Sequence, residues 1–249
     1  MNIGVIFAGG VGCRMRSKER PKQFLEICNK PIIIYTLEHF ENNADIDAIV
    51  IACIEEWIPY LEELLYKYRI EKVKKIVPGG RTGQLSIYNG LLAAKEIAGE
   101  EEAVVLIHDG VRPLINSKLL SENIKSVKEH GSAITTGVVK ETIIVVDAKS
   151  DVEEIPTRDK SRVAKAPQSF WLKDILEVHE ETLKDGIDNC IDSCTMMKNY
   201  GYKLHVVDGP SENIKITTPE DFYEMRAILE AKENAQIYGL EEYYPKGEL

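Results

Sequence analysis

The sequence IGVIFAGGVGCRM at residues 3–15 decides the fold class of this chain, and PKQ follows it at residues 21–23. It begins with an apolar run, which predicts a buried first strand. Because the glycines that follow carry no Cβ, backbone N–H groups can approach a phosphate closely there. Arg14 and Lys22 add two cations beside this turn, so the stretch predicts a nucleoside triphosphate site.

Two other kinds of glycine loop fit this stretch less well. A dinucleotide-binding loop needs a third glycine where Met15 stands, and a P-loop needs a lysine directly after its glycines, whereas Lys22 lies well beyond them. The simplest alternative is a tight turn between a strand and a helix, with cations that lie there by chance. The spacing of Arg14 and Lys22 favours phosphate chemistry over that alternative.

The composition is that of a globular protein in a reducing compartment. The chain has 249 residues, of which 44% are hydrophobic and 29% charged, and its formal net charge is −10. This length suits one domain over residues 1–249, and the negative charge argues against a nucleic-acid partner. Its five cysteines are an odd number, and neither a signal peptide nor an apolar run of membrane-spanning length is apparent. We therefore expect a cytoplasmic protein without a membrane partner.

Apolar, β-branched runs alternate with amphipathic stretches along the chain. This alternation predicts an α/β fold with a mostly parallel central sheet and helices on both faces, whose ligands bind beyond the carboxyl ends of the strands. The expected strands are Ile3–Ala8, Ala48–Ile54, Lys74–Val77, Ala103–His108, Ser132–Val139, Thr142–Asp147, Lys203–Val207 and Asn213–Ile216. The expected helices are Pro31–Phe40, Trp57–Tyr68, Gln84–Ile97, Ser117–His130, Trp171–Lys184, Asp192–Tyr200 and Thr218–Ala235. A charged, hairpin-like stretch at residues 138–162 interrupts the alternation, and we expect it to form a projecting β-arm.

Two further strand ends carry candidate site residues. Asp109 follows a predicted buried strand, where it could hold a divalent cation or a ribose hydroxyl, or pair with Arg112 in an ordinary turn. The loop from Gly80 to Ser86 follows another strand and could read a base edge through its backbone and the Ser86 hydroxyl. Two glycines before a helix are also common in loops of no particular function.

Three polar residues later in the chain are candidates as well. Lys215 interrupts an apolar run, so it either extends to solvent or faces a polar site, and beside a phosphate-binding cleft we favour the site. Arg158 lies in the expected arm. Asp192 begins a helix, where it is expected to be the N-cap residue, with binding of a substrate hydroxyl as the alternative.

Five motifs in this order resemble the cytidylyltransferase family of 2-C-methyl-D-erythritol 4-phosphate cytidylyltransferase and ribitol-5-phosphate cytidylyltransferase. They are AGGVGCRM at 8–15, PKQF at 21–24, HDGVRP at 108–113, APQSF at 166–170 and NIKITTPED at 213–221, and they span nearly the whole chain. The resemblance implies a Rossmann-like nucleotidyltransferase fold, CTP as the donor, Mg²⁺ as the cofactor and a homodimer formed through the arm.

The resemblance also implies a role for individual positions. Arg14 and Lys22 would be catalytic, by stabilising the transition state at the CTP phosphates, and Arg158 and Lys215 would bind the acceptor phosphate. CTP would be held by Phe7, Ala8, Gly9, Gly10, Gly80, Arg81, Thr82, Gly83, Ser86 and Gly110. From their places in the sequence we add Asp109, as a ligand of the nucleotide and the metal ion, and Asp192 on the acceptor side.

The implied reaction is in-line nucleotidyl transfer. A phosphate oxygen of the acceptor attacks the α-phosphorus of CTP, and pyrophosphate leaves. The nucleophile is already anionic near neutral pH, so catalysis rests on positioning and charge neutralisation, without a general base. His108 is therefore expected to be structural.

The acceptor that we expect is D-ribitol 5-phosphate, which would give CDP-ribitol for wall or capsule polymers. APQSF, IDSC and TTPEDF look more like the ribitol enzymes, whereas methylerythritol enzymes more often have Thr at position 166 and Thr-Asp at 191–192. 2-C-methyl-D-erythritol 4-phosphate, used in isoprenoid synthesis, is the alternative acceptor. A sugar-1-phosphate nucleotidyltransferase with another donor and a catalytically silent nucleotide-binding module are further alternatives. The intact basic and acidic candidates argue against a silent module.

Overall fold

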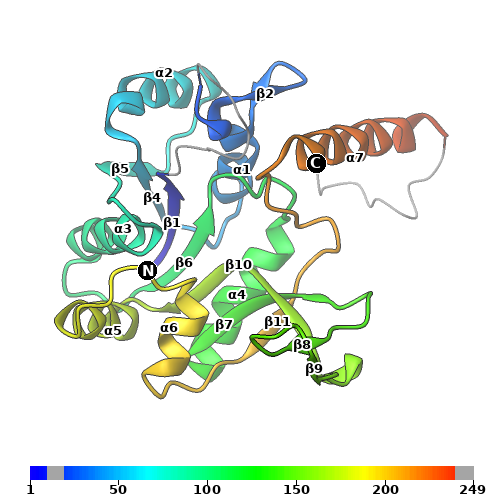
Figure 1. Ribbon diagram of the computed structural model, residues 1–249. Helices are drawn as coiled ribbons and strands as arrows, with labels where there is room; N and C mark the ends of the chain where they lie inside the picture. Colours follow the sequence, from blue (N-terminus) through cyan, green and yellow to red (C-terminus); the bar gives the residue numbers. More distant parts are fainter. Residues whose placement is uncertain (10–19, 239–249) are drawn as a thin grey trace.

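Figure 1 shows the computed structural model of the chain, in which residues 1–9 and 20–238 are described. Seven strands form one sheet in the order β11-β7-β10-β6-β1-β4-β5. They are β1 (Asn2–Ala8), β4 (Ala48–Cys53), β5 (Val73–Pro78), β6 (Val104–Asp109), β7 (Ser132–Val138), β10 (Arg162–Trp171) and β11 (Val206–Asp208). Within this sheet only β10 runs antiparallel to its neighbours, so the expected mostly parallel sheet is confirmed.

Helices cover both faces of this sheet, as the alternation predicts. One face carries α1 (Ile32–Glu41), α2 (Ile58–Tyr68) and α4 (Ser117–His130), and the other carries α3 (Gly83–Ala98), α5 (Leu172–Lys184) and α6 (Ser193–Asn199). Within β1, Ile6 and Ala8 pack into the first of these cores, whereas Ile3 and Val5 pack into the second. Alternate side chains of a strand point to opposite faces, so β1 carries no polar side chain from residue 3 to residue 8 because both of its faces are covered.

The carboxyl ends of β1 and β6 lie side by side. β1 runs parallel to β4 on one side and to β6 on the other, and Phe7 is in register with both Ala52 and Asp109. The order of the strands along the chain reverses at this point, which is where open α/β sheets bind ligands. The sheet thus brings Gly9 and Asp109 to the same edge.

β10 is a strand that the sequence pattern does not predict. Lys165 and Pro167 interrupt its apolar residues, and its pairing with β7 shifts register between Ala164 and Gln168. Residues 166–170 are nevertheless buried, because β6 and β7 pair with the strand on both sides. Its place in the sheet is therefore determined by its neighbours more than by its own pattern.

The strand predicted at Asn213–Ile216 is wrong, because this segment is an irregular connector. The Ile216 amide donates to the Val111 carbonyl at 2.9 Å, and the Asn213 side chain donates to the Ala166 carbonyl at 2.8 Å. The connector is thus tied to the loop after β6 and to β10. These ties hold Lys215 near the carboxyl edge of the sheet.

The helix that follows, α7 (Pro219–Tyr238), begins where the sequence predicts. The Asp221 carboxylate accepts the Thr218 amide at 2.8 Å, and the Asp221 amide donates to the Thr218 hydroxyl at 3.4 Å, which is the arrangement of a capping box. Met225 packs with Ile216 in a small third core. Within the described residues, no helix has both the length and the apolar character needed to cross a membrane.

The chain between β7 and β10 leaves the sheet as the expected arm (Figure 1). It contains the short antiparallel pair β8 (Val145–Val146) and β9 (Val152–Glu154), followed by the 3₁₀ turn η4 (Arg158–Lys160). The strand expected at Thr142–Asp147 is therefore shorter than predicted. Apolar side chains of the arm face solvent, with Val152 56% and Ile155 62% exposed. The arm thus carries apolar surface that its own chain does not bury.

Candidate active site

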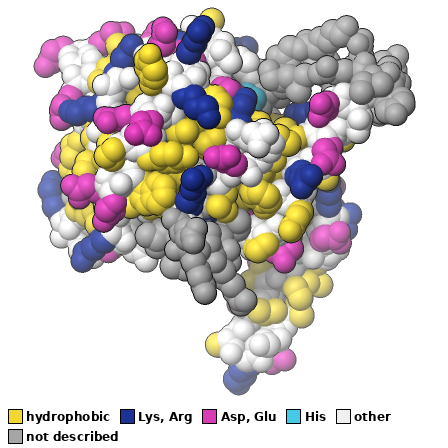
Figure 2. All heavy atoms as spheres, turned by 90° about the horizontal axis from the view of Figure 1, so that it is seen from above, with side chains coloured by type: hydrophobic (Ala, Val, Ile, Leu, Met, Phe, Trp, Pro, Cys, Tyr) yellow, Lys and Arg dark blue, Asp and Glu magenta, His cyan; other side chains and the backbone are white. Residues whose placement is uncertain are grey.

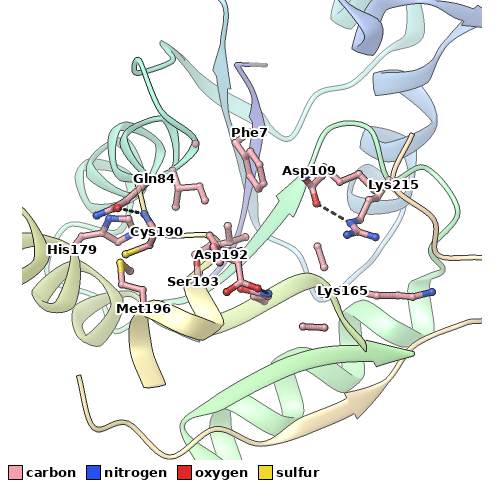
Figure 3. Close-up of a pocket in the computed structure, with 18 residues that line it drawn as sticks. Phe7, Gln84, Asp109, Lys165, His179, Cys190, Asp192, Ser193, Met196 and Lys215 are labelled. Atoms are coloured by element: carbon pink, nitrogen blue, oxygen red, sulfur yellow. Dashed lines mark hydrogen bonds and ion pairs between the residues drawn. The ribbon is translucent and has the colours of Figure 1, made fainter. Parts of the chain in front are cut away.

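A cavity of about 290 Å³ lies beside the carboxyl ends of β1 and β6 (Figure 3). Asp109 and Lys215 line its charged end. Arg112 also lines the cavity and forms an ion pair with Asp109. His179 and Cys190 line the opposite end, which is less polar. The cavity therefore offers a charged end and a mainly uncharged end to one bound molecule.

The two glycine loops of the predicted nucleotide site are in contact. A Cβ on Gly9 would lie 2.9 Å from the Ser86 Oγ, and a Cβ on Gly79 would lie 3.4 Å from the Gly9 Cα. Such close approach explains why glycine stands at both positions. Ser86 is buried, accepts the Gly80 amide at 3.0 Å and donates to the Thr82 carbonyl at 2.9 Å. The Ser86 hydroxyl is thus engaged in holding the loop itself.

The other predicted nucleotide residues lie around these loops. Phe7 and Gly83 line the cavity. The Gly110 amide donates to the Phe7 carbonyl at 3.1 Å, and a Cβ on Gly110 would lie 3.3 Å from that of Ala8. Arg81 is exposed and forms an ion pair with Asp188. Most of this set is therefore gathered at one edge of the sheet.

Lys22 lies in the 3₁₀ turn η2 (Lys22–Phe24), which is bonded to the end of β1. The buried side-chain amide of Gln23 donates to the Ala8 carbonyl at 2.6 Å. This bond holds the turn beside Gly9, so the predicted catalytic lysine lies next to the nucleotide loops. The predicted residues Gly10 and Arg14 lie outside the described part of the chain.

The Asp109 carboxylate forms ion pairs with two cationic side chains of the cavity. It is 5% exposed, and its Oδ1 lies 2.5 Å from the Lys215 Nζ while its Oδ2 lies 2.8 Å from the Arg112 Nε. Burial raises the pKa of this carboxyl, but Lys215 and Arg112 together outweigh burial and lower the pKa to about 2. Asp109 is therefore a carboxylate at neutral pH. Two cations around one carboxylate leave a net positive charge, which suits a phosphate group.

Asp109 also fits the expected Mg²⁺. Among the described residues, no group of three or more His, Cys, Asp and Glu side chains could hold a metal ion unaided. Mg²⁺ is usually bound by one or two carboxylates together with substrate phosphates and water. Each Asp109 oxygen keeps a lone pair beyond the one used by its cation. Asp109 could therefore serve as the protein ligand of Mg²⁺ once a nucleotide supplies phosphate oxygens.

The two predicted acceptor residues other than Lys215 lie in different places. Asp192 lines the cavity and caps α6, because its Oδ1 accepts the Thr195 amide at 2.8 Å. The bond from the Thr195 amide confirms the predicted N-cap role, and the Asp192 Oδ2 accepts the Gln168 side chain at 3.0 Å. Arg158 lies in the arm, where it donates to the Thr142 hydroxyl at 3.1 Å, and it does not line the cavity described here.

Several cavity residues are not among the predicted site residues. Arg112 could have been inferred from its spacing with Asp109, because an Asp–Arg pair is the ordinary turn structure for that motif. Lys165 also lines the cavity, and burial, reinforced by Arg112, lowers its pKa. Gln84 lies in the predicted loop and Gln168 in the APQSF motif, but the sequence assigns neither a role, because a glutamine by itself is common on protein surfaces.

Two buried histidines lie at or near the cavity and have lowered pKa values. His108 is fully buried and donates from Nε2 to the Arg112 carbonyl at 3.0 Å, which supports the structural role expected for it. His179 is buried at the less polar end of the cavity, and neither of its ring nitrogens has a hydrogen-bond partner among the described residues. Burial lowers the pKa of each to about 4, so both are neutral at physiological pH.

Comparisons with known proteins agree with this geometry. The family model described as IspD: 2-C-methyl-D-erythritol 4-phosphate cytidylyltransferase matches residues 3–231. A ribitol-5-phosphate cytidylyltransferase of Vibrio parahaemolyticus is 55% identical over 239 residues, which cover 96% of this chain and 100% of that protein. A 2-C-methyl-D-erythritol 4-phosphate cytidylyltransferase of Clostridium botulinum is 39% identical over 229 residues, which cover 92% of this chain and 97% of that protein.

A solved structure resembles the fold throughout. The crystal structure of 4-diphosphocytidyl-2C-methyl-D-erythritol synthase from Anaerococcus prevotii matches with a TM-score of 0.80 and 28% identity. The match covers 92% of this chain and 96% of that one. The Rossmann-like nucleotidyltransferase fold expected from the sequence is thereby confirmed.

Proposed function

Because this chain belongs to the IspD family of cytidylyltransferases, we propose that it transfers CMP from CTP to D-ribitol 5-phosphate. The products are CDP-ribitol, a precursor of wall or capsule polymers, and pyrophosphate. Nucleotidyl transfer is supported above all by one observation. The cluster of Asp109, Arg112 and Lys215 lies beside two glycine loops at one edge of the sheet. The choice of acceptor is supported by the higher identity to the ribitol enzyme, 55% against 39%.

The reaction follows from the charges of the cavity. The acceptor phosphate binds at Lys215 and Arg112, and one of its oxygens attacks the α-phosphorus of CTP. The bond from that phosphorus to the bridging oxygen breaks, and pyrophosphate leaves. Lys22, with Arg14, stabilises the negative charge that gathers at the phosphates in the transition state. No base is needed, since the attacking oxygen is already anionic.

Cytidylyltransferases of this family generally depend on a divalent metal ion. We assign this ion as Mg²⁺, held by Asp109 together with the nucleotide phosphates. When bound, it supplies additional neutralisation of the phosphate charge.

The cysteines and the surface charge of the chain support a proposed cellular compartment and a proposed class of partner. Residues 1–249 act as one nucleotidyltransferase domain in the cytoplasm, and the four described cysteines, all unbridged, suit a reducing compartment. On the face in Figure 2, basic and acidic side chains are interspersed with apolar ones among the described residues. This mixture, with a net charge of −10, supports a small-molecule partner over a nucleic acid.

The acceptor is tested by measuring pyrophosphate release. The enzyme is given CTP and Mg²⁺ with D-ribitol 5-phosphate or 2-C-methyl-D-erythritol 4-phosphate in parallel. We expect kcat/KM for ribitol 5-phosphate to be at least about tenfold higher, because the chain is 55% identical to a ribitol-5-phosphate cytidylyltransferase and 39% identical to a methylerythritol phosphate enzyme. A preference for methylerythritol phosphate would move the enzyme to isoprenoid synthesis. CTP binding without pyrophosphate release from either acceptor would favour a catalytically silent module.

The arm is proposed to form a homodimer and to complete the site of the partner subunit. Its exposed apolar side chains, such as Val152 and Ile155, would be buried against a second copy. Arg158 lies on the same arm and away from the cavity of its own chain, which supports a role in the cavity of the other chain.

A mixing experiment tests this arrangement. Arg158→Ala is expected to lower kcat/KM for the acceptor about tenfold, and Lys22→Ala to abolish most turnover. If Arg158 acts in the other subunit, a heterodimer of the two variants has one site with both residues intact. Refolding the two variants together should then restore about a quarter of wild-type turnover, since half of the dimers are mixed. Activity equal to the mean of the separate variants would mean that Arg158 acts within its own chain.

A further inference from the structure

The segment between α5 and α6, residues 185–192, forms one wall of the cavity. Cys190, Ile191 and Asp192 of this segment line the cavity directly. Residues 187–192 adopt neither helix nor strand, so the backbone hydrogen bonds of a helix or sheet do not fix the shape of this wall. Side chains from other elements must therefore hold it in place.

Arg81, Thr82 and Gln84, which lie at or just before the start of α3, supply that support. The Thr82 hydroxyl donates to the Asp188 carbonyl at 2.6 Å, and Arg81 forms an ion pair with the Asp188 carboxylate. Gln84, in the first turn of α3, reaches further under the wall (Figure 3). The wall of the cavity and the start of α3 are thus bonded at several points.

Gln84 uses both ends of its side-chain amide in these contacts. Its Nε2 donates to the Thr182 Oγ1 and to the Ile187 carbonyl, each at 3.0 Å. Its Oε1 accepts the Cys190 amide at 2.8 Å. Gln84 is 4% exposed, and a buried amide with both ends bonded fixes the groups around it. It therefore bridges α5 to the cavity wall at two places.

The same turn of α3 is continuous with the nucleotide loop. Ser86 accepts the Gly80 amide at 3.0 Å, and its Oγ is the atom that a Cβ on Gly9 would meet at 2.9 Å. The residues that hold the cavity wall and those that hold the nucleotide loop thus alternate along the first turn of one helix. A shift of this turn on nucleotide binding would be transmitted to the wall.

We propose that Gln84 is a positioning residue that couples the nucleotide loop to the acceptor side of the cavity. It sets the position of residues 187–192, so that CTP binding at the glycine loops orders the wall against which the acceptor binds. This inference rests on the proposed function, because it takes the cavity as the acceptor site.

The test replaces Gln84 by methionine, which has a similar length and lacks both polar ends. We expect Gln84→Met to raise KM for ribitol 5-phosphate about tenfold, with KM for CTP changed less than about twofold. Asn89→Ala is the matched control, because Asn89 is an amide on the same helix that donates to the Pro78 carbonyl and does not line the cavity. It should leave both KM values unchanged. An equal rise in both values, or no rise, would overturn the proposal.

Hydrogen exchange gives a readout that needs no acceptor. CTP with Mg²⁺ should slow amide exchange at residues 79–86 and at 187–192 in the wild type, and only at 79–86 in Gln84→Met. Protection at 79–86 alone in the wild type, or at both segments in the variant, would contradict the coupling. If CTP protects neither segment, or if the wild type releases no pyrophosphate, the proposed function itself is wrong. That outcome differs from a failure of the coupling alone, in which the wild type is active and CTP protects only residues 79–86.

A second variant covers the case in which Gln84→Met does not fold. Thr182→Val has nearly the same shape and removes one of the three bonding partners of Gln84. It should raise KM for the acceptor about threefold and partly reduce protection of residues 187–192. A folded Thr182→Val enzyme with wild-type protection and wild-type KM would also overturn the proposal.

Discussion

Replacing Lys22 by alanine is expected to lower kcat at least about a hundredfold, with kcat/KM for CTP falling by a similar factor. The bond from Gln23 to the Ala8 carbonyl holds the turn of Lys22 beside the glycine loops, where the phosphates of CTP bind in the proposed reaction. A cation that acts on charge developing in the transition state affects kcat more than substrate binding. Steady-state pyrophosphate release with CTP and ribitol 5-phosphate measures both constants.

Lys118→Ala is the control for this variant. Lys118 is a lysine of α4 whose side chain is 74% exposed, so its loss should leave kcat unchanged. The sequence predicts a comparable loss for Arg14→Ala, although Arg14 lies outside the described residues. Near-normal turnover in both folded variants, Lys22→Ala and Arg14→Ala, would falsify the assignment of the reaction.

Replacing Lys215 by methionine is expected to lower kcat/KM for the acceptor about a hundredfold, which corresponds to about 2.7 kcal/mol. The substitution keeps the length of the side chain and removes the charge that lies 2.5 Å from the Asp109 Oδ1. Among the described residues, Asp109, which is 5% exposed, then keeps only Arg112 as an ion-pair partner, and the net positive charge of these three side chains is lost. The side chains of the cluster would then offer an acceptor phosphate no net positive charge.

A lysine of matched exposure serves as the control for Lys215. Lys75 pairs with Glu96 on the surface, and its side chain is 37% exposed against 38% for Lys215. Lys75→Met should therefore leave kcat/KM for both substrates unchanged, because surface ion pairs contribute little. If Lys75→Met and Lys215→Met behave alike, Lys215 has no special role at the acceptor phosphate.

Much of the fold could be predicted from the local pattern of apolar and polar residues, but strand β10 could not. β4 is apolar throughout, and β1 and β6 are apolar apart from Asn2 at the start of β1 and His108 and Asp109 at the end of β6, as expected of parallel strands covered on both faces. β10 instead contains Lys165 and Pro167 and shifts register along its length. It is a central strand because β6 and β7 leave a place between them, and no window of its own sequence encodes that place.

The candidate site divides in the same way. The sequence by itself determined the strand, the glycines after it and the carboxylate at the end of β6, because backbone freedom and strand burial are properties of short segments. Only the tertiary structure decided that Lys215 would pair with Asp109, and that Gln84 would hold the wall at Cys190. These partners lie far apart in the sequence, and their distances depend on the strand order and on the connector before α7. A contact between distant segments is fixed by how the whole chain packs, so it leaves no periodic trace at either residue.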